Sequence, residues 1–206
     1  MAELLTVWMA SEEAASRSAA DSPILPSSAV QLLERFRRGD ASAFDEIVAH
    51  LHPMVFRVAI RLLGNREDAE DVVQETFWNL YRASASLRNP ACLQAWLYRS
   101  TVNGARSHLS RSRRRLERRP PETPVWEAAA PGVNVAEILL LRDAIEQALA
   151  ELTAKEREAL VLRDIEGLEI AEVAAAMGVF TVTVRTHLSR ARLKLRQILR
   201  ERGIHP

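Results

Sequence analysis

The sequence predicts an all-α protein built from two small helical domains joined by a flexible, proline-rich linker. Apolar residues recur at the three- and four-residue spacing of a helix along most of the chain, and no segment shows the two-residue alternation of a strand. Four prolines then interrupt this pattern (Pro120, Pro121, Pro124 and Pro131), and proline cannot continue a helix. A length of 206 residues suits one or two domains of about 100 residues each.

Residues 1–28 predict a disordered tail, because they are rich in Ala and Ser and contain Pro23 and Pro26. The first helical domain is expected over residues 29–112. Its first helix carries Val30, Leu33 and Phe36 on one face and stops at Gly39-Asp40.

Three further helices are expected before residue 83. The first has the apolar stripe Ala43, Phe44, Ile47, Val48 and Leu51, and Pro53 is expected to interrupt it. The second has the stripe Met54, Val55, Val58, Ala59, Leu62 and Leu63 and ends at Gly64. Asn65 and Asp68 predict a capping box for the third. Its inward residues are Ala69, Val72, Val73, Thr76, Phe77 and Leu80.

A loop over residues 83–91 and a fifth helix complete the predicted first domain. The fifth helix presents inward Leu93, Trp96, Leu97, Ser100, Thr101, Gly104, Ala105 and Leu109. Several of these residues are small, which allows close contact with a neighbouring helix.

The linker is expected over residues 113–134 and the second domain over residues 135–206. A helix with Ile138, Leu141, Ile145, Leu149 and Leu152 opens this domain. Thr153 and Glu156 then predict a capping box, and the helix that they start runs toward Gly167.

The end of the second domain predicts a helix-turn-helix. Its first helix has the stripe Ile170, Val173, Ala174 and Met177, and Gly178 supplies the turn. Thr181 is expected to cap the second helix, whose stripe is Val184, Leu188, Ala191 and Leu195. The outer positions of the second helix are basic and polar: Arg185, Thr186, Ser189, Arg190, Arg192, Lys194 and Arg196. This geometry suits the major groove of DNA, although two packed helices with a solvated basic face would give the same pattern.

Charge is segregated although the net charge is only +1. Residues 99–119 carry eight arginines against Glu117, and residues 185–202 carry six arginines and Lys194 against Glu201. Residues 67–75 carry five acids and no base. The two basic segments favour a polyanionic partner, and the acidic one favours a separate basic protein partner.

Several function classes find no support in the sequence. Cys92 is the single cysteine, and His50 and His52 point to different faces of a helix, so no metal site is expected. We expect no cofactor and no catalysis, because no phosphate loop, dinucleotide fingerprint or catalytic triad is present. No apolar run is long enough for a membrane helix, and no signal peptide is expected at the N-terminus.

The chain resembles the extracytoplasmic-function (ECF) sigma factors of bacterial RNA polymerase, within the sigma-70 superfamily. In the first domain the resemblance rests on Arg37-Arg38-Gly39-Asp40, on the run from Arg61 to Gly64, on the run from Asp68 to Phe77, on Trp96-Leu97-Tyr98-Arg99 and on Asn103. In the second it rests on the runs 160–163, 166–168, 172–174, 178–179, 183–185 and 190–192. The joint order of these short matches across two domains makes the resemblance specific.

The resemblance implies that the first domain is sigma region 2, which binds core polymerase and the minus-ten promoter element. Binding to the clamp coiled coil of the polymerase is then expected from Asp68, Asp71, Gln74 and Glu75. Spaced at i, i+3 and i+7, Asp68, Asp71 and Glu75 would share one helix face. Acids in a first helical turn also complement the helix dipole, which explains Asp68 and Asp71 but not Glu75.

The loop 83–91 and the fifth helix correspond to the family's reader of the minus-ten element. Contact with that element is expected from Trp78, Tyr81, Tyr98, Arg99, Asn103, Arg106 and Arg111. The aromatic rings would stack on unpaired bases and the arginines would hold phosphates. Trp96 and Phe77 are better explained as core residues, and for Trp78, Tyr81 and Tyr98 both interpretations stay open.

The second domain corresponds to sigma region 4, which reads the minus-thirty-five element. Contact with that element is expected from Thr183, Arg185, Thr186, Ser189, Arg190 and Arg192. The chain departs from the family in having Phe180-Thr181-Val182 where Pro-Val-Gly is usual, and His187 where a base is common. These departures bear on which promoter sequence is read.

The resemblance therefore predicts a cytoplasmic sigma factor that directs promoter-specific initiation. Its expected partners are core polymerase, through the clamp coiled coil and the flap, promoter DNA, and an anti-sigma factor, without membrane insertion. An ordinary helix-turn-helix regulator that acts without polymerase is the alternative. It would account for residues 152–199 but would leave the acidic helix without a role.

Overall fold

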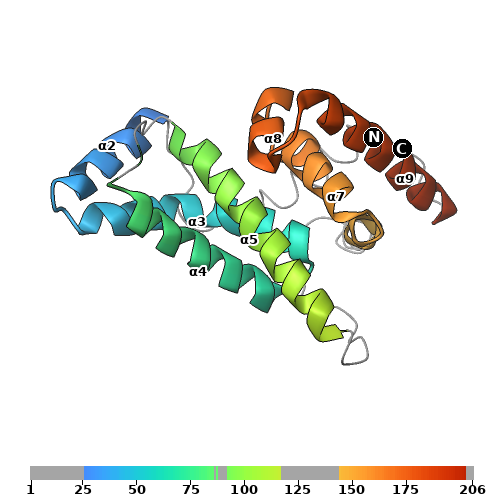
Figure 1. Ribbon diagram of the computed structural model, residues 1–206, viewed down its shortest axis with the longest axis horizontal. Coiled ribbons are helices and arrows are strands. Elements are labelled where there is room, and N and C mark those ends of the chain that lie inside the picture. Colours follow the sequence, from blue (N-terminus) through green and yellow to red (C-terminus); the bar gives the residue numbers. More distant parts are fainter. Residues whose placement is uncertain (1–25, 86, 88–91, 117–143, 203–206) are drawn as a thin grey trace, which may run out of the picture. The chain divides into compact units, whose positions relative to one another are not determined.

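The computed structural model describes residues 26–85, 87, 92–116 and 144–202. These residues divide between two compact units, an N-terminal one and a C-terminal one (Figure 1). Regular structure in the described ranges is helical throughout, which confirms the predicted all-α class. The predicted tail and most of the predicted linker lie outside the described residues.

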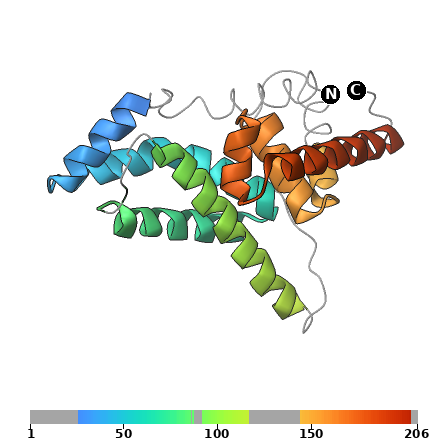
Figure 2. The same cartoon turned by 45° about the horizontal axis from the view of Figure 1, so that its top comes forward.

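In the part of the first unit that the structure describes there are four helices, α2 (Pro26–Arg37), α3 (Ser42–Leu63), α4 (Arg66–Ala83) and α5 (Leu93–Leu116). α3, α4 and α5 pack against one another, α2 packs against the start of α3, and α5 crosses the other two obliquely (Figure 2). The core between them contains Leu33, Ile47, Val58, Leu80 and Leu97, all fully buried. Each lies on a stripe that the sequence predicts to face inward.

The predicted break at Pro53 is wrong, because α3 runs unbroken through it. Proline removes one backbone donor, and the carbonyl that this donor would have served belongs to Ala49. Ala49 is exposed, so its carbonyl can bond to water instead. Apolar residues on both sides of the proline, Leu51 and Met54 among them, bury one continuous face that holds the helix together.

The contact between α4 and α5 is close because Gly104 has no side chain. A Cβ atom there would lie 3.1 Å from Cγ1 of Val72. Asn65 caps α4, its side chain accepting a hydrogen bond from the Asp68 backbone at 3.2 Å, which is one half of the predicted capping box. α5 continues to Leu116, four residues beyond the predicted end of the first domain at residue 112.

The second unit contains a helical segment over residues 144–150 and then α7 (Ala154–Leu160), which continues as one π-helical turn, η2 (Val161–Ile165). Two further helices follow, α8 (Ile170–Met177) and α9 (Thr181–Glu201). The capping box of Thr153 and Glu156 is confirmed at the start of α7. α9 packs against both α7 and α8. Its buried residues are Val184, Leu188, Ala191, Leu195 and Leu199.

α8, a tight turn and α9 form the predicted helix-turn-helix. Gly178 turns the chain in the left-handed conformation with φ of 67°, and Val179 donates to the carbonyl of Ala174 at 3.1 Å. The predicted cap at Thr181 is wrong. Phe180 occupies the capping position and provides no side-chain hydrogen bond, while Thr181 already lies inside the helix.

Candidate functional site

One face of α4 is acidic and exposed. Asp71, Gln74 and Glu75 are exposed on it, whereas Asp68 is half-buried in the first turn of the helix. Val72 and Phe77 are buried on the opposite side. The α4 acidic face, as we call Asp68, Asp71, Gln74 and Glu75, is therefore open to a partner along most of its length.

A hollow of about 590 Å³ lies beside this face, between α4 and the C-terminal part of α5. Its walls are Asp71, Gln74, Glu75, Trp78, His108, Arg111 and Ser112. Arg111 approaches Glu75 with a nitrogen–oxygen distance of 3.8 Å, and His108 approaches Asp68 at 3.6 Å. Two residues predicted to contact DNA, Trp78 and Arg111, thus lie with the acids predicted to contact polymerase.

His108 and Ser112 are members of this hollow that the sequence reasoning missed. A signal was present, because Gly104, His108 and Ser112 follow one another at four-residue spacing on the α5 stripe. Since Gly104 brings α5 against Val72, residues one and two turns later reach the neighbouring part of α4.

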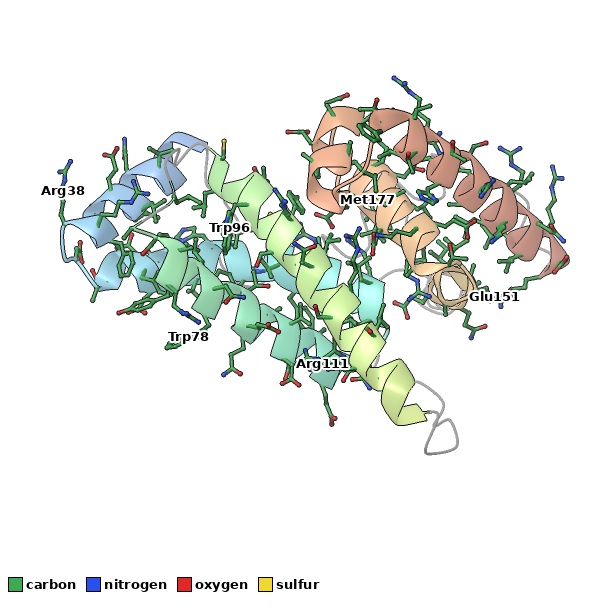
Figure 3. The ribbon with its side chains drawn as sticks, viewed as in Figure 1. Arg38, Trp78, Trp96, Arg111, Glu151 and Met177 are labelled. Carbon is green, nitrogen blue, oxygen red and sulfur yellow. The ribbon has the colours of Figure 1, made fainter. Side chains whose placement is uncertain are left out.

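The aromatic residues divide between surface and core. Trp78 is 60% exposed and points outward from α4 (Figure 3), and Tyr81 is 49% exposed. Their rings are nearly parallel, with centroids 6.1 Å apart. The ring of Tyr81 also packs against Phe36 and Phe44, with centroid distances of 5.4 and 5.3 Å, and these contacts hold it in place.

Tyr98 does not fit the predicted contact with DNA. It is only 5% exposed, because its position on α5 directs it into the core beside Leu97. Phe77 is buried, in agreement with its interpretation as a core residue, whereas Trp96 is only half-buried.

Three polar residues follow one another along another face of α5. Arg99 and Asn103 are exposed and Arg106 is half-buried, at i, i+4 and i+7. The structure brings these three together, whereas Arg111 belongs to the hollow beside α4. The face therefore offers two cations and one amide to a partner.

On α9, most of the predicted reading residues are exposed. Arg185, Thr186, Ser189, Arg190 and Arg192 lie at the surface, and Thr183 is half-buried. The hydroxyl of Thr186 donates to the carbonyl of Val182 at 3.0 Å. A hollow of about 550 Å³ adjoins this surface and is lined by Arg163, Ile170, Arg185, Leu188, Ser189, Arg192, Leu193 and Arg196.

Arg192 is exposed but differs from Arg185 and Arg190 because an ion pair within the unit holds it. Its guanidinium donates two hydrogen bonds to Asp164 of η2, at 2.6 and 2.8 Å. These bonds raise the pKa of Arg192 above its ordinary value. Arg192 therefore ties α9 to η2, whereas the sequence predicts that Arg192 contacts DNA.

A second ion pair fixes α9 to the start of α7. The ammonium of Lys194 lies 2.7 Å from the carboxylate oxygen Oε2 of Glu156, and the same oxygen accepts a hydrogen bond from the Thr153 backbone at 3.1 Å. Burial opposes the ionisation of Glu156, but the hydrogen bonds from Lys194 and Thr153 outweigh it and lower the pKa of Glu156. α9 is thus held by two ion pairs as well as by its buried apolar stripe.

Over the ranges described, no helix has the length and apolarity needed to cross a membrane. The same residues contain no group of three or more His, Cys, Asp and Glu that could hold a metal ion.

An acidic helix in one helical unit and a helix-turn-helix in the other are typical of a DNA-binding transcription factor. The Sigma-70 region 2 family matches residues 47–115, and the Sigma-70 region 4 family matches residues 142–195. The chain is 34% identical over 175 residues to the RNA polymerase sigma-H factor of Pseudomonas aeruginosa, spanning 79% of this chain and 89% of that one. It is 33% identical over 174 residues to the ECF RNA polymerase sigma-E factor of Escherichia coli K12, spanning 78% and 88%.

A solved structure of CnrH in complex with the cytosolic domain of CnrY has the same fold. It aligns with a TM-score of 0.61 and 25% identity, over 84% of this chain and 98% of that one. The chain belongs to the ECF sigma factors of the sigma-70 family. It is a sigma factor, so it directs RNA polymerase to promoters, and the match to region 2 favours this function over that of an ordinary helix-turn-helix regulator. Its relatives are sigma factors, which are not enzymes.

Proposed function

We propose that the α4 acidic face binds the clamp coiled coil of core polymerase, while separate basic surfaces on α5 and α9 bind promoter DNA. The observation that carries the proposal is the separation of charge between these surfaces. Acids are exposed on one face of α4, and exposed arginines lie on α5 and α9. A basic protein surface and a polyanion would each find one complementary site.

The ion pair beside the acidic face is loose enough for a partner to replace it. Arg111 and Glu75 are 3.8 Å apart, and both side chains are about half exposed. Pairs of this kind contribute about 0–1 kcal/mol. A lysine or arginine of polymerase can therefore replace Arg111 as the partner of Glu75 at a small cost in free energy. Because Trp78 and Arg111 line the same hollow, we assign them to the border of the polymerase surface in preference to DNA.

For the minus-ten element we propose the face formed by Arg99, Asn103 and Arg106, with Tyr81 as a stacking surface. The two arginines suit phosphates, and the amide suits a base edge. Tyr81 is half exposed and supported by two phenylalanines, which holds its ring in place for an unpaired base.

For the minus-thirty-five element we propose α9, inserted into the major groove with Arg185, Thr186, Ser189 and Arg190 toward the DNA. All four are exposed on the side away from the buried stripe. Thr183, half-buried in the first turn, lies near enough to the leading end to contact a phosphate. Region 2 is taken as residues 29–112 and region 4 as residues 135–206.

The remaining partners are the polymerase flap, bound by region 4, and an anti-sigma factor that covers both functional surfaces. CnrH was solved with the cytosolic domain of another protein, CnrY. A regulator of that kind would place this sigma factor in the cytoplasm.

The proposal is tested by reversing charge on the acidic face. Asp71→Arg combined with Glu75→Arg should weaken binding to purified core by about tenfold or more, because like charges then face each other across the interface. The measurement is a titration of labelled sigma factor with core, with helicity followed by circular dichroism.

The matched control is Asp45→Arg with Glu201→Arg, which makes the same change in net charge at two exposed acids away from α4. This control should bind core like the unmodified protein. Equal affinities for the test pair and the control pair would refute the assignment of the acidic face.

A further inference from the structure

Two large apolar side chains are exposed at the start of α9. Phe180 is 81% exposed and Val182 is 65% exposed. Phe180 also occupies the capping position, where Ser, Thr, Asp or Asn would stabilise the helix by about 1 kcal/mol, and its side chain makes no capping hydrogen bond. Neither residue therefore contributes to the core or to the cap, which points to a role in contact with a partner.

Val182 extends the exposed face of Arg185, Thr186 and Ser189 at the N-terminal end of α9, and Phe180 immediately precedes the helix. Val182, Arg185, Thr186 and Ser189 lie at i, i+3, i+4 and i+7, and all are exposed. The hydrogen bond from Thr186 to the carbonyl of Val182 belongs to this face. In a helix-turn-helix, the N-terminal residues of the second helix are those that reach base edges.

The positive charge around Phe180 and Val182 favours DNA as their partner. From Thr181 to Arg200, α9 contains no acidic residue, and Arg185 and Arg190 are exposed near the apolar pair. A basic or purely apolar protein surface would be repelled or poorly matched there, whereas DNA is attracted. The apolar group that DNA presents in its major groove is the C5-methyl of thymine, which aromatic and aliphatic side chains contact.

We propose that Phe180 and Val182 are specificity-determining residues that contact thymine methyl groups in the minus-thirty-five element. The inference rests on the proposed function of α9 as the reader of that element. It adds an apolar component at the leading end of the helix, beside the polar contacts of Arg185 and Thr186.

The test uses holoenzyme assembled from core polymerase and the full chain. A duplex promoter is selected from a library randomised in the minus-thirty-five element, and each thymine of both strands is then replaced by deoxyuridine, which removes only the methyl group. At one or two positions the unmodified holoenzyme should lose about fourfold in affinity, the factor given by burial of one methyl-sized group. Holoenzymes with Phe180→Ala or Val182→Ala should bind the unmodified promoter less tightly. Their affinity should fall no further when the thymine that the residue contacts is replaced by deoxyuridine.

Leu193→Ala is the matched control, since Leu193 is 66% exposed on the same helix but lies away from its leading end. It should keep the full deoxyuridine effect. The inference would be overturned if the selected element contained no thymine, or if no deoxyuridine substitution lowered the affinity of the unmodified holoenzyme. It would also be overturned if the alanine variants lost as much affinity on deoxyuridine DNA as the unmodified holoenzyme does. That last result would favour a protein partner for Phe180. The proposed function fails separately, if the holoenzyme selects no minus-thirty-five sequence at all.

Discussion

At the scale of single residues, arginines on one helix have different functions because their partners differ. Arg185 is exposed on the reading face, and among the described residues no ion pair involves it. Arg192, two turns further on, is held by two hydrogen bonds to Asp164. Exposure and charge do not distinguish Arg185 from Arg192, but the ion pair between Arg192 and Asp164 does.

Arg185→Ala should therefore reduce discrimination between promoters. A bidentate contact of arginine with a base edge contributes about 1–3 kcal/mol, so the ratio of affinities for cognate and scrambled minus-thirty-five DNA should fall about 5- to 150-fold. The measurement is competition binding by holoenzyme. Arg192→Ala should preserve that ratio and lower the melting temperature instead. An unchanged ratio for Arg185→Ala would show that this residue contacts phosphate only.

At the scale of helices, the packing of α4 against α5 depends on a missing side chain. A Cβ on Gly104 would lie 3.1 Å from Val72, closer than most packed atoms. Gly104→Val should therefore destabilise the protein by about 1–3 kcal/mol, as overpacked cores do. The control Asn103→Val places the same side chain at the adjacent, exposed position. Urea unfolding should show a much smaller loss for the control, and equal losses would mean that helix propensity alone is responsible.

The contact between α7 and α9 should be sensitive to pH through Glu156. Its pKa lies below the ordinary value of 4.5, so its stabilising effect is present above that pH and is lost as the pH falls through the lowered pKa. Glu156→Gln should melt at a lower temperature than the unmodified protein at pH 7, and the difference should shrink toward pH 3. Glu201→Gln, a change at an exposed acid, should show no such convergence. A difference that stays constant with pH would contradict the role of the charge.

Helix periodicity is sufficient to predict every buried residue of α4, because burial on a helix repeats every three to four positions. It also predicts the buried stripe of α9 as far as Leu195, but not its last member, Leu199. It failed where a local rule was outweighed by packing. Pro53 breaks helices in general, yet the buried face on both sides of it keeps α3 continuous. Tyr98 was ambiguous because a tyrosine suits both core and surface, and only the orientation of α5 places it inside. His108 became part of the candidate site through contacts between distant segments, which spacing along one helix does not specify.

At the scale of the whole molecule, the protein consists of two units whose connection is rich in proline. A connection of this composition is expected to leave the spacing of the two DNA-binding surfaces unspecified. Each unit alone is also about the size of a single DNA-binding module, and one module seldom binds a specific site tightly. The free protein should therefore recognise a promoter poorly.

Core polymerase should supply the missing constraint. Once both units are docked on it, contact of the second unit with DNA becomes effectively intramolecular, which raises affinity by about 100-fold or more without any new contact. Mobility shifts on a cognate promoter, with and without core, measure this difference. The Asp71→Arg, Glu75→Arg variant should lose most of the gain at limiting core concentration, because it binds core more weakly. If the free chain bound the promoter as tightly as the holoenzyme does, its two units would already be correctly spaced in solution, and polymerase would not be needed for recognition.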